Sequence, residues 1–216
     1  MNKFELVLFD LDGTLTDPKT GITNSVMYAL KKKGYKIPER DRLLFFIGPP
    51  LIDSFRNYLK LSTEQAAEMV EIYREYFSTK GIYENSVIDG AENLLKNLKN
   101  SGVKLALATS KPKVFADEIL KHFDLLKYFD ITVGSNLDGT LVDKGEVIST
   151  VLQNFKNTEN TKIAMVGDRC FDIIGARQNG IMPIGVLCGY GEESELTSAG
   201  AQVLAKDLTE LNKILL

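Results

Sequence analysis

From Gly90 onward, short apolar segments alternate with longer amphipathic segments, and this alternation limits the possible folds more than any other feature of the sequence. The apolar segments have the length of strands, whereas the others show helical spacing and cap signals. Strands that alternate with helices in this way predict an α/β fold with a parallel sheet and helices on both faces. The expected strands are 4–9, 103–108, 131–133, 162–166 and 184–187. The expected helices are 91–99, 112–122, 145–155 and 208–215, with a further helix that follows Asp168 and ends at Asn179.

Residues 16–82 have a different pattern, which predicts a helical insert. A helix is expected to begin at Ser62 or Thr63, because either residue can cap it. The two prolines of Gly48-Pro49-Pro50 must interrupt the helical structure. We therefore expect two domains: a discontinuous core and a small all-helical domain, with hinges at 16–21 and 83–90. Their expected ranges are 1–15 with 83–216 for the core, and 16–82 for the insert, with helices at 22–33, 43–46, 51–59 and 63–77.

Composition places the 216-residue chain among ordinary globular proteins, with 44% hydrophobic and 25% charged residues. No apolar stretch reaches the roughly 20 residues of a membrane span, and the N-terminus does not resemble a secretory signal. A net charge of −3 without a dense basic patch argues against nucleic-acid binding. Two cysteines, Cys170 and Cys188, favour a reducing cytoplasm. The single histidine, His122, lies within an expected helix, so the chemistry must proceed without histidine.

Two carboxylates, Asp10 and Asp12, directly follow the first expected strand. Repulsion and desolvation both oppose such a pair unless a cation or a proton shares the site. The pair suits metal-assisted chemistry in which one carboxylate attacks and the other transfers a proton.

Further polar residues follow the later strands or begin a later helix. Thr109 and Ser110 follow the second strand, Lys144 begins a helix, and Asp168 follows a fourth strand. Parallel sheets bind ligands in the crevice beyond the carboxyl ends of their strands. The sequence therefore predicts that these residues and the two carboxylates form one site.

The motif Asp10-Leu11-Asp12-Gly13-Thr14 resembles the first motif of the haloacid dehalogenase-like phosphatases. The other parts of that family's pattern follow in the same order, as Leu105–Thr109, Lys144 and Ala164–Asp172, so the resemblance covers nearly the whole chain. It implies a Rossmann-like core, a Mg2+ cofactor and a phosphatase that forms an aspartyl-phosphate. In the family the insert between the first two motifs is a helical cap.

The resemblance implies separate roles for the acids. Asp10 would be the nucleophile and a magnesium ligand, and Asp168 a second ligand. Asp12 would bind the metal through its backbone carbonyl, protonate the leaving group and later activate water. Asp172 could bind the metal, bind a coordinated water or cap a helix, and we favour the contact through water. Cys170 is expected to be a partly buried free thiol.

Phosphate oxygens would be bound by Lys144 and the Thr109 hydroxyl, with Ser110 contributing its hydroxyl or its backbone amide. Gly13 would allow the backbone to approach the phosphate closely. Gly145 follows Lys144 where the family commonly has proline, and Lys111 is a rival phosphate ligand.

The Gly48-Pro49-Pro50 loop could present backbone amides to the substrate or could simply connect two helices. The stretches 46–51 and 134–140 resemble the phosphoglycolate phosphatase and bacterial 5′-nucleotidase groups, which implies a small phosphorylated metabolite as substrate. A sugar-phosphate mutase and a catalytically idle phospho-ligand-binding protein remain alternatives, whereas dehalogenases lack the second aspartate. We expect a monomer or homodimer with no membrane or nucleic-acid partner.

Overall fold

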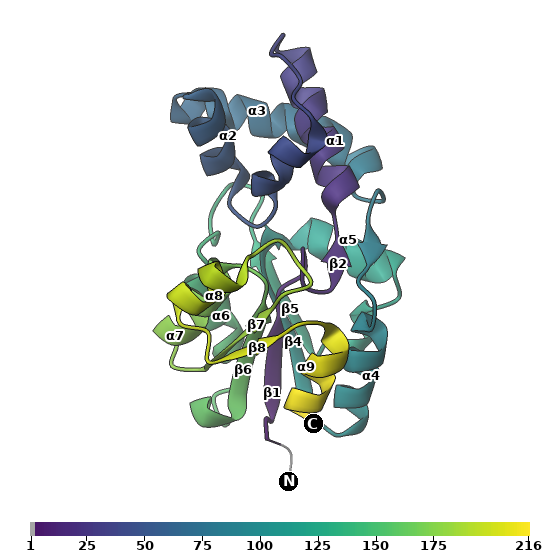
Figure 1. The fold of residues 1–216 in the computed structure, drawn as a ribbon, viewed down its shortest axis with the longest axis vertical. Helices are drawn as coiled ribbons and strands as arrows, with labels where there is room; N and C mark the ends of the chain where they lie inside the picture. Colours follow the sequence, from purple (N-terminus) through teal and green to yellow (C-terminus); the bar gives the residue numbers. More distant parts are fainter. Residues whose placement is uncertain (1–2) are drawn as a thin grey trace. The chain divides into compact units, whose positions relative to one another are not determined.

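The computed structural model describes residues 3–216, which form two compact units (Figure 1). The core unit contains the chain up to Asp17 together with Val87–Leu216, and the helical unit is Pro18–Ser86. The boundaries lie at 17/18 and 86/87, whereas the sequence led us to expect 15/16 and 82/83. Two short strands, β2 (Thr16–Asp17) and β3 (Ser86–Val87), pair with each other where the chain passes between the units.

The core unit is built on a parallel sheet of six strands in the order β5-β4-β1-β6-β7-β8. All four residues of β1 are fully buried, as expected for a central strand that is covered on both faces. The strands are β1 (Leu6–Phe9), β4 (Lys104–Pro112), β5 (Ile131–Ser135), β6 (Ile163–Gly167), β7 (Met182–Val186) and β8 (Val203–Ala205).

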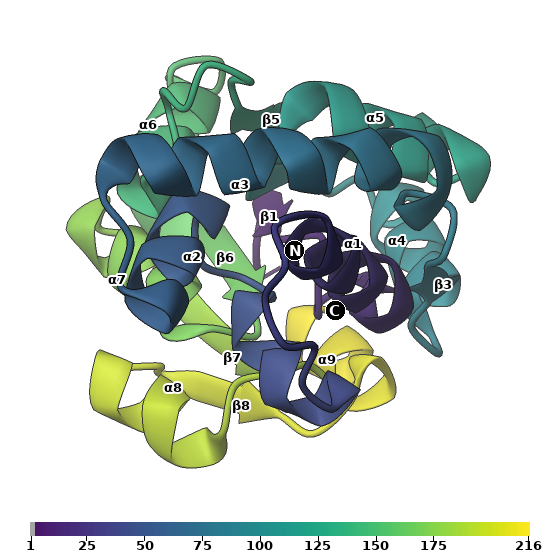
Figure 2. The same ribbon diagram turned by 90° about the horizontal axis from the view of Figure 1, so that it is seen from above.

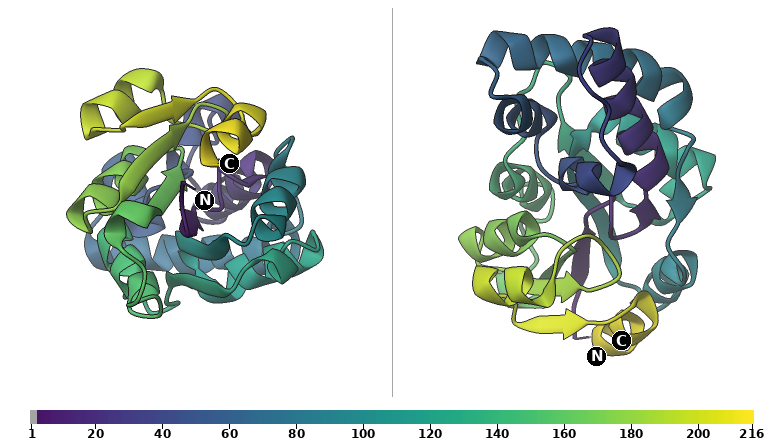
Figure 3. Two further views of the ribbon diagram at one scale, coloured as in Figure 1. Left: turned by 90° about the horizontal axis from the view of Figure 1, so that it is seen from below. Right: turned by 45° about the horizontal axis from the view of Figure 1, so that its top comes forward.

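Helices cover both faces of this sheet (Figure 3). Side chains alternate between the faces of a strand, so Leu6 and Leu8 of β1 point to one face, where they pack with α6 and α7. On the other face α4 and α9 pack together. The helices are α4 (Ala91–Asn100), α5 (Lys113–His122), α6 (Lys144–Leu152), α7 (Cys170–Gln178), α8 (Glu193–Ala199) and α9 (Leu208–Leu215).

The helical unit has its own apolar core. In it α3 packs against α1 and α2 (Figure 2), and Phe46 and Phe55 meet edge to face with ring centroids 4.9 Å apart. Ser62 caps α3, since its hydroxyl accepts the Gln65 N–H while the Gln65 side chain accepts the Ser62 N–H. The elements are α1 (Lys19–Lys32), the 3-10 helix η1 (Arg40–Phe46), α2 (Leu51–Leu59), α3 (Thr63–Tyr76) and the π-helix η2 (Phe77–Gly81).

The fold class predicted from the sequence is confirmed: a parallel sheet with helices on both faces, and a separate group of helices. Three details differ. The strand expected to end before Thr109 continues through β4 to Pro112, with an irregular register between these residues. The segment from 188 to 207 contains α8, which is short and largely polar, and β8, which has only three residues, so neither gives a clear periodic signal. The short helix expected at 43–46 begins earlier, at Arg40, and is a 3-10 helix.

None of the helices in residues 3–216 has the length and apolar character needed to cross a membrane.

Candidate active site

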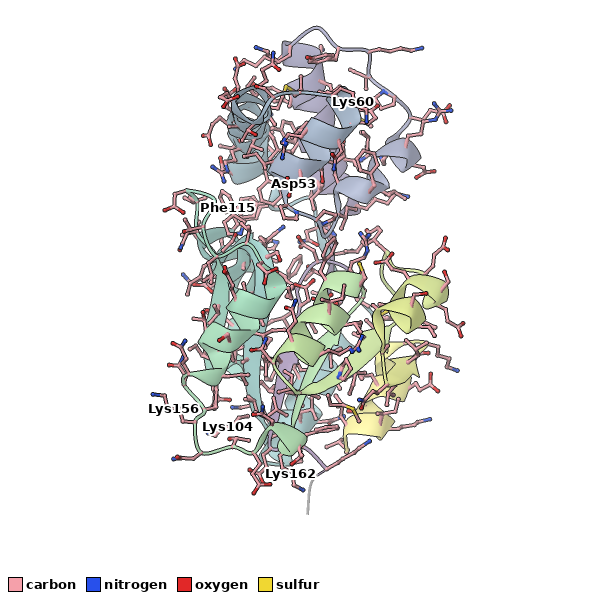
Figure 4. The ribbon with its side chains drawn as sticks, turned by 90° about the vertical axis from the view of Figure 1, so that its left-hand side faces the viewer. Asp53, Lys60, Lys104, Phe115, Lys156 and Lys162 are labelled. Atoms are coloured by element: carbon pink, nitrogen blue, oxygen red, sulfur yellow. The ribbon has the colours of Figure 1, made fainter. Side chains whose placement is uncertain are left out.

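The acidic residues lie together because β1 and β6 are neighbouring parallel strands. Asp10 directly follows β1 and Asp168 directly follows β6, so both stand at the carboxyl edge of the sheet. The backbone N–H of Asp10 donates to the Val166 carbonyl over 2.9 Å, which extends the pairing of β1 with β6 to Asp10. Lys104 and Lys162 lie at the opposite edge, at the amino ends of β4 and β6 (Figure 4). The predicted clustering at one edge is therefore present.

The loop after β1 turns sharply around Gly13. Its N–H donates to the Thr16 carbonyl over 2.7 Å, and its φ of +84° is strained for any residue with a side chain. A Cβ atom at this position would also lie 2.7 Å from Asp168 Cγ. Glycine is therefore required here both for the turn and for the approach of Asp168. Its expected contact with phosphate stays a prediction.

Lys144, the first residue of α6, is buried among oxygen atoms. Its ammonium donates to Asp10 Oδ1 over 2.9 Å and to the Ala108 carbonyl over 3.0 Å, and it forms an ion pair with Asp172 Oδ1 at 2.8 Å. Burial lowers the pKa of Lys144, but the Asp10 and Asp172 carboxylates more than offset this, and the net pKa is raised. The ammonium therefore stays charged and holds the nucleophile candidate in place.

Lys111 holds the second carboxylate. Its ammonium donates to Asp12 Oδ2, and both side chains are buried. The other oxygen, Asp12 Oδ1, is buried without a hydrogen-bond partner among residues 3–216. Burial raises the pKa of Asp12, the Lys111 ammonium lowers it, and the charge of Asp10 raises it, with a net increase. Asp12 thus has one anchored oxygen and one that is available to a proton or a ligand.

Three buried acids have the donor set of a metal site. Oxygens of Asp10, Asp168 and Asp172 all lie within 4.8 Å of one another. Burial, together with the charges of Asp172 and Asp10, raises the pKa of Asp168 to about 8, and burial raises that of Asp172 to about 6. A hard divalent cation would relieve this repulsion and prefers oxygen ligands. The residues present therefore fit a magnesium ion.

Asp168 is held by two residues that the sequence analysis did not single out. The Thr14 hydroxyl donates to Asp168 Oδ1 over 3.2 Å, and the Tyr190 N–H donates to Asp168 Oδ2 over 2.8 Å. Thr14 belongs to the recognised Asp10–Thr14 motif and could have been found there. Tyr190 lies in an irregular segment after β7, where no periodic pattern indicates what its backbone contacts.

Thr109 and Ser110 lie on β4, in the strand after which the sequence predicts them, but their hydroxyl groups make different contacts. Thr109 is buried, and its hydroxyl accepts the Lys111 N–H over 3.3 Å. The Ser110 hydroxyl donates to the Val142 carbonyl over 3.1 Å, which ties β4 to the loop before α6. This contact leaves the backbone amide as the better candidate for a Ser110 contact with phosphate.

Gly48 and Pro49 lie in the helical unit, between η1 and α2. Gly48 has a φ of +105°, which suits a sharp break, and Pro50 occupies the position just before the first residue of α2. Their contact with a substrate stays a prediction.

Asp172 lies in the first turn of α7, where it accepts the Arg169 N–H over 3.1 Å and pairs with Lys144. The helix-cap contact left open by the sequence is thus present, and it coexists with the position beside the metal ligands. Cys170 is a partly buried free thiol, as expected, and Cys188 is a second one.

Comparison with known proteins agrees with this geometry. A family model described as haloacid dehalogenase-like hydrolase matches residues 7–186. The chain belongs to this family. A 5′-nucleotidase of Pseudomonas aeruginosa is 43% identical over 99% of this chain and 96% of its own length. A crystal structure of a predicted phosphatase from Clostridium acetobutylicum covers 98% of this chain and 97% of its own, with a TM-score of 0.94 and 45% identity.

A second kind of relative is also similar over the whole chain. The tyrosine-protein kinase PtkA of Mycobacterium tuberculosis is 37% identical over 98% of this chain and 72% of its own length. The resemblance to haloacid dehalogenase-like enzymes inferred from the motifs is confirmed, and so is the conclusion that the protein is an enzyme of this hydrolase family.

Proposed function

We propose that the protein is a magnesium-dependent phosphomonoester hydrolase that acts on a small phosphorylated metabolite through an aspartyl-phosphate on Asp10. The proposal rests on the family, on the cluster of buried acids, and on the two ion pairs in which Lys144 binds Asp10 and Lys111 binds Asp12.

The observation that carries the proposal is that the two carboxylates of the first motif are bound differently. Lys144 binds Asp10, whereas Lys111 binds only one oxygen of Asp12 and leaves the other buried and unpaired. A binding protein for phosphate would gain nothing from a carboxylate oxygen in this state, since it repels an anion and is costly to bury. A side chain that acts first as general acid and then as general base must give a proton to the leaving group and later take one from water. Such a side chain requires an oxygen in this state.

In the first step an Asp10 carboxylate oxygen attacks phosphorus, and the bond from phosphorus to the ester oxygen breaks. Asp12 gives its proton to the departing oxygen. In the second step Asp12 takes a proton from water, whose oxygen attacks the phosphoryl group and releases Asp10 and inorganic phosphate. Lys144 and the Thr109 hydroxyl would bind the non-bridging oxygens, where negative charge must be balanced throughout.

The metal would be held by Asp10, Asp168 and the backbone carbonyl of Asp12, with Asp172 beside them. When bound, magnesium supplies positive charge that offsets the repulsion between the phosphate dianion and the carboxylates. Asp172 already pairs with Lys144 and accepts the Arg169 N–H, which favours a contact through coordinated water over direct ligation.

A nucleoside 5′-monophosphate is the first substrate candidate, because the relative that is 43% identical is named a 5′-nucleotidase. Phosphoglycolate is the second, from the motif resemblance. The helical unit would act as a cap that selects the leaving group. The cytoplasmic location and the monomeric or dimeric state stay predictions.

The test is a release assay with magnesium over nucleoside monophosphates, phosphoglycolate, pyrophosphate and sugar phosphates. We expect free phosphate from at least one ester, and none from Asp10→Asn, which keeps the shape but not the nucleophile. Product analysis by NMR would separate hydrolysis from isomerisation. Release of phosphate by Asp10→Asn at the wild-type rate, or isomerised product without free phosphate, would contradict the proposal.

A further inference from the structure

A short loop after β7 passes directly over the candidate metal ligand Asp168. Its sequence is Gly189-Tyr190-Gly191, and the N–H of Tyr190 donates to Asp168 Oδ2 over 2.8 Å. With the Thr14 hydroxyl on Asp168 Oδ1, the loop gives each oxygen of this buried carboxylate a fixed donor. The loop therefore helps to fix the orientation of the Asp168 carboxylate.

Glycine is required at both Gly189 and Gly191 because the loop lies so close to Asp168. A Cβ atom on Gly189 would lie 2.5 Å from Asp168 Cβ, and one on Gly191 would lie 3.1 Å from the Asp168 carbonyl carbon, with other atoms closer still. Neither glycine has a positive φ, so neither is needed for an unusual backbone conformation. Their role is to let the loop lie against Asp168 closely enough for the Tyr190 N–H to reach it.

The side chain of Tyr190 anchors the same loop at its other side. Its hydroxyl donates to Asp17 Oδ1, at the end of β2. Asp17 is the last residue of the core unit before the chain enters the helical unit at Pro18. Tyr190 thus contacts the candidate metal ligand through its backbone and the last residue of β2 through its side chain.

We propose that Tyr190 is a positioning residue for the metal site: its hydroxyl bond to Asp17 fixes the Gly189-Tyr190-Gly191 loop, and its backbone amide then orients the Asp168 carboxylate. This rests on the proposed function, which makes Asp168 a magnesium ligand. Partners that orient metal ligands typically contribute about 10- to 100-fold in metal affinity. Metal affinity in this protein is therefore coupled to the strand where the chain leaves the core.

The experiment measures magnesium binding directly, by isothermal titration calorimetry on the whole protein, and then kcat and the magnesium concentration for half-maximal activity. Tyr190→Phe removes only the hydroxyl and keeps the backbone N–H. We expect about tenfold weaker magnesium binding and a matching rise in the magnesium requirement, with kcat at saturating metal changed far less. Tyr128→Phe is the matched control, because Tyr128 in the same unit donates to exposed Glu92 over 3.0 Å. It should bind magnesium as the wild type does.

A double mutant tests whether Tyr190 acts through its hydrogen bond to Asp17 at the end of β2. If Tyr190 and Asp17 act as one unit, Tyr190→Phe combined with Asp17→Ala should weaken magnesium binding no more than the stronger single change. Additive losses would overturn the link. The proposal is also overturned if Tyr190→Phe binds magnesium within about twofold of the wild type, or if the wild type does not bind magnesium. Failure of the proposed function would appear separately, as a wild type that binds magnesium but releases no phosphate.

Discussion

Replacing Lys144 with methionine should make the protein unstable in a way that depends strongly on pH. Methionine keeps an unbranched side chain of similar length but removes the ammonium that lies 2.9 Å from Asp10 Oδ1 and 2.8 Å from Asp172 Oδ1. All three side chains are buried, so solvent cannot replace the lost partner. Breaking a buried ion pair by removing one partner typically costs about 3–5 kcal/mol. We expect a loss of this size in the free energy of unfolding at pH 8.

The sign of the pH dependence follows from the raised carboxylate pKa values. Burial raises the pKa of Asp172 to about 6 even with Lys144 present, and removal of the ammonium raises it further. A group whose pKa is higher in the folded state destabilises that state progressively as pH rises through the folded pKa. The destabilisation by Lys144→Met should therefore be largest at pH 8 and smaller at pH 5, where Asp172 is protonated in both proteins.

The assay is urea unfolding of wild type and variant at pH 5 and pH 8 in EDTA, followed by circular dichroism. Lys104→Met is the control, because Lys104 is exposed and its pair with Asp130 at 3.3 Å should contribute only about 0–1 kcal/mol. A loss below about 1 kcal/mol at pH 8, or the same loss at both pH values, would refute the account of Lys144 as the charge that holds the carboxylates.

Three further outcomes are expected. Asp12→Asn should lower kcat by about 10²- to 10⁴-fold while rapid-mixing assays still detect phosphorylated Asp10 from an aryl phosphate with a good leaving group, and wild-type turnover would contradict this. In EDTA the free energy of unfolding should fall by up to about 1.4 kcal/mol per pH unit as pH rises toward the Asp168 pKa of about 8, and the melting temperature should fall with it. Magnesium should raise the melting temperature more at pH 8.5 than at pH 6. Replacing Pro49 and Pro50 with alanine should change the order of kcat/KM among esters, and a uniform change would show that the loop only connects helices.

Local patterns in the sequence were sufficient to predict five of the six strands of the sheet and the acids at its edge. Asp10 and Asp168 could be placed together because each follows an apolar strand, and the carboxyl ends of parallel strands share one edge. The N-cap at Ser62 was predictable for the same reason, since a capping box involves residues close in sequence.

Contacts between residues far apart in the sequence could not be predicted in this way. Lys111 was recognised as a rival phosphate ligand, but its pairing with Asp12 depends on how β4 bends after Thr109, where the register with β5 is irregular. Tyr190 lies in a loop without periodicity, and its contacts are with Asp168 and Asp17, far away along the chain. Such pairings are determined by tertiary packing and leave no local signal.

The strand order has a consequence for the way the protein is made. β1 leaves the ribosome before both of its partners, β4 and β6, and Leu6 pairs with both Lys104 and Ile163. The helices from α1 to α3 contact mainly one another and are complete long before either partner strand is synthesised. The strand that precedes the nucleophile candidate must therefore remain unpaired until β4 has been synthesised, with a fully apolar Leu-Val-Leu-Phe sequence exposed to other chains. Any chain that stops before β6 leaves one edge of this strand open to aggregation.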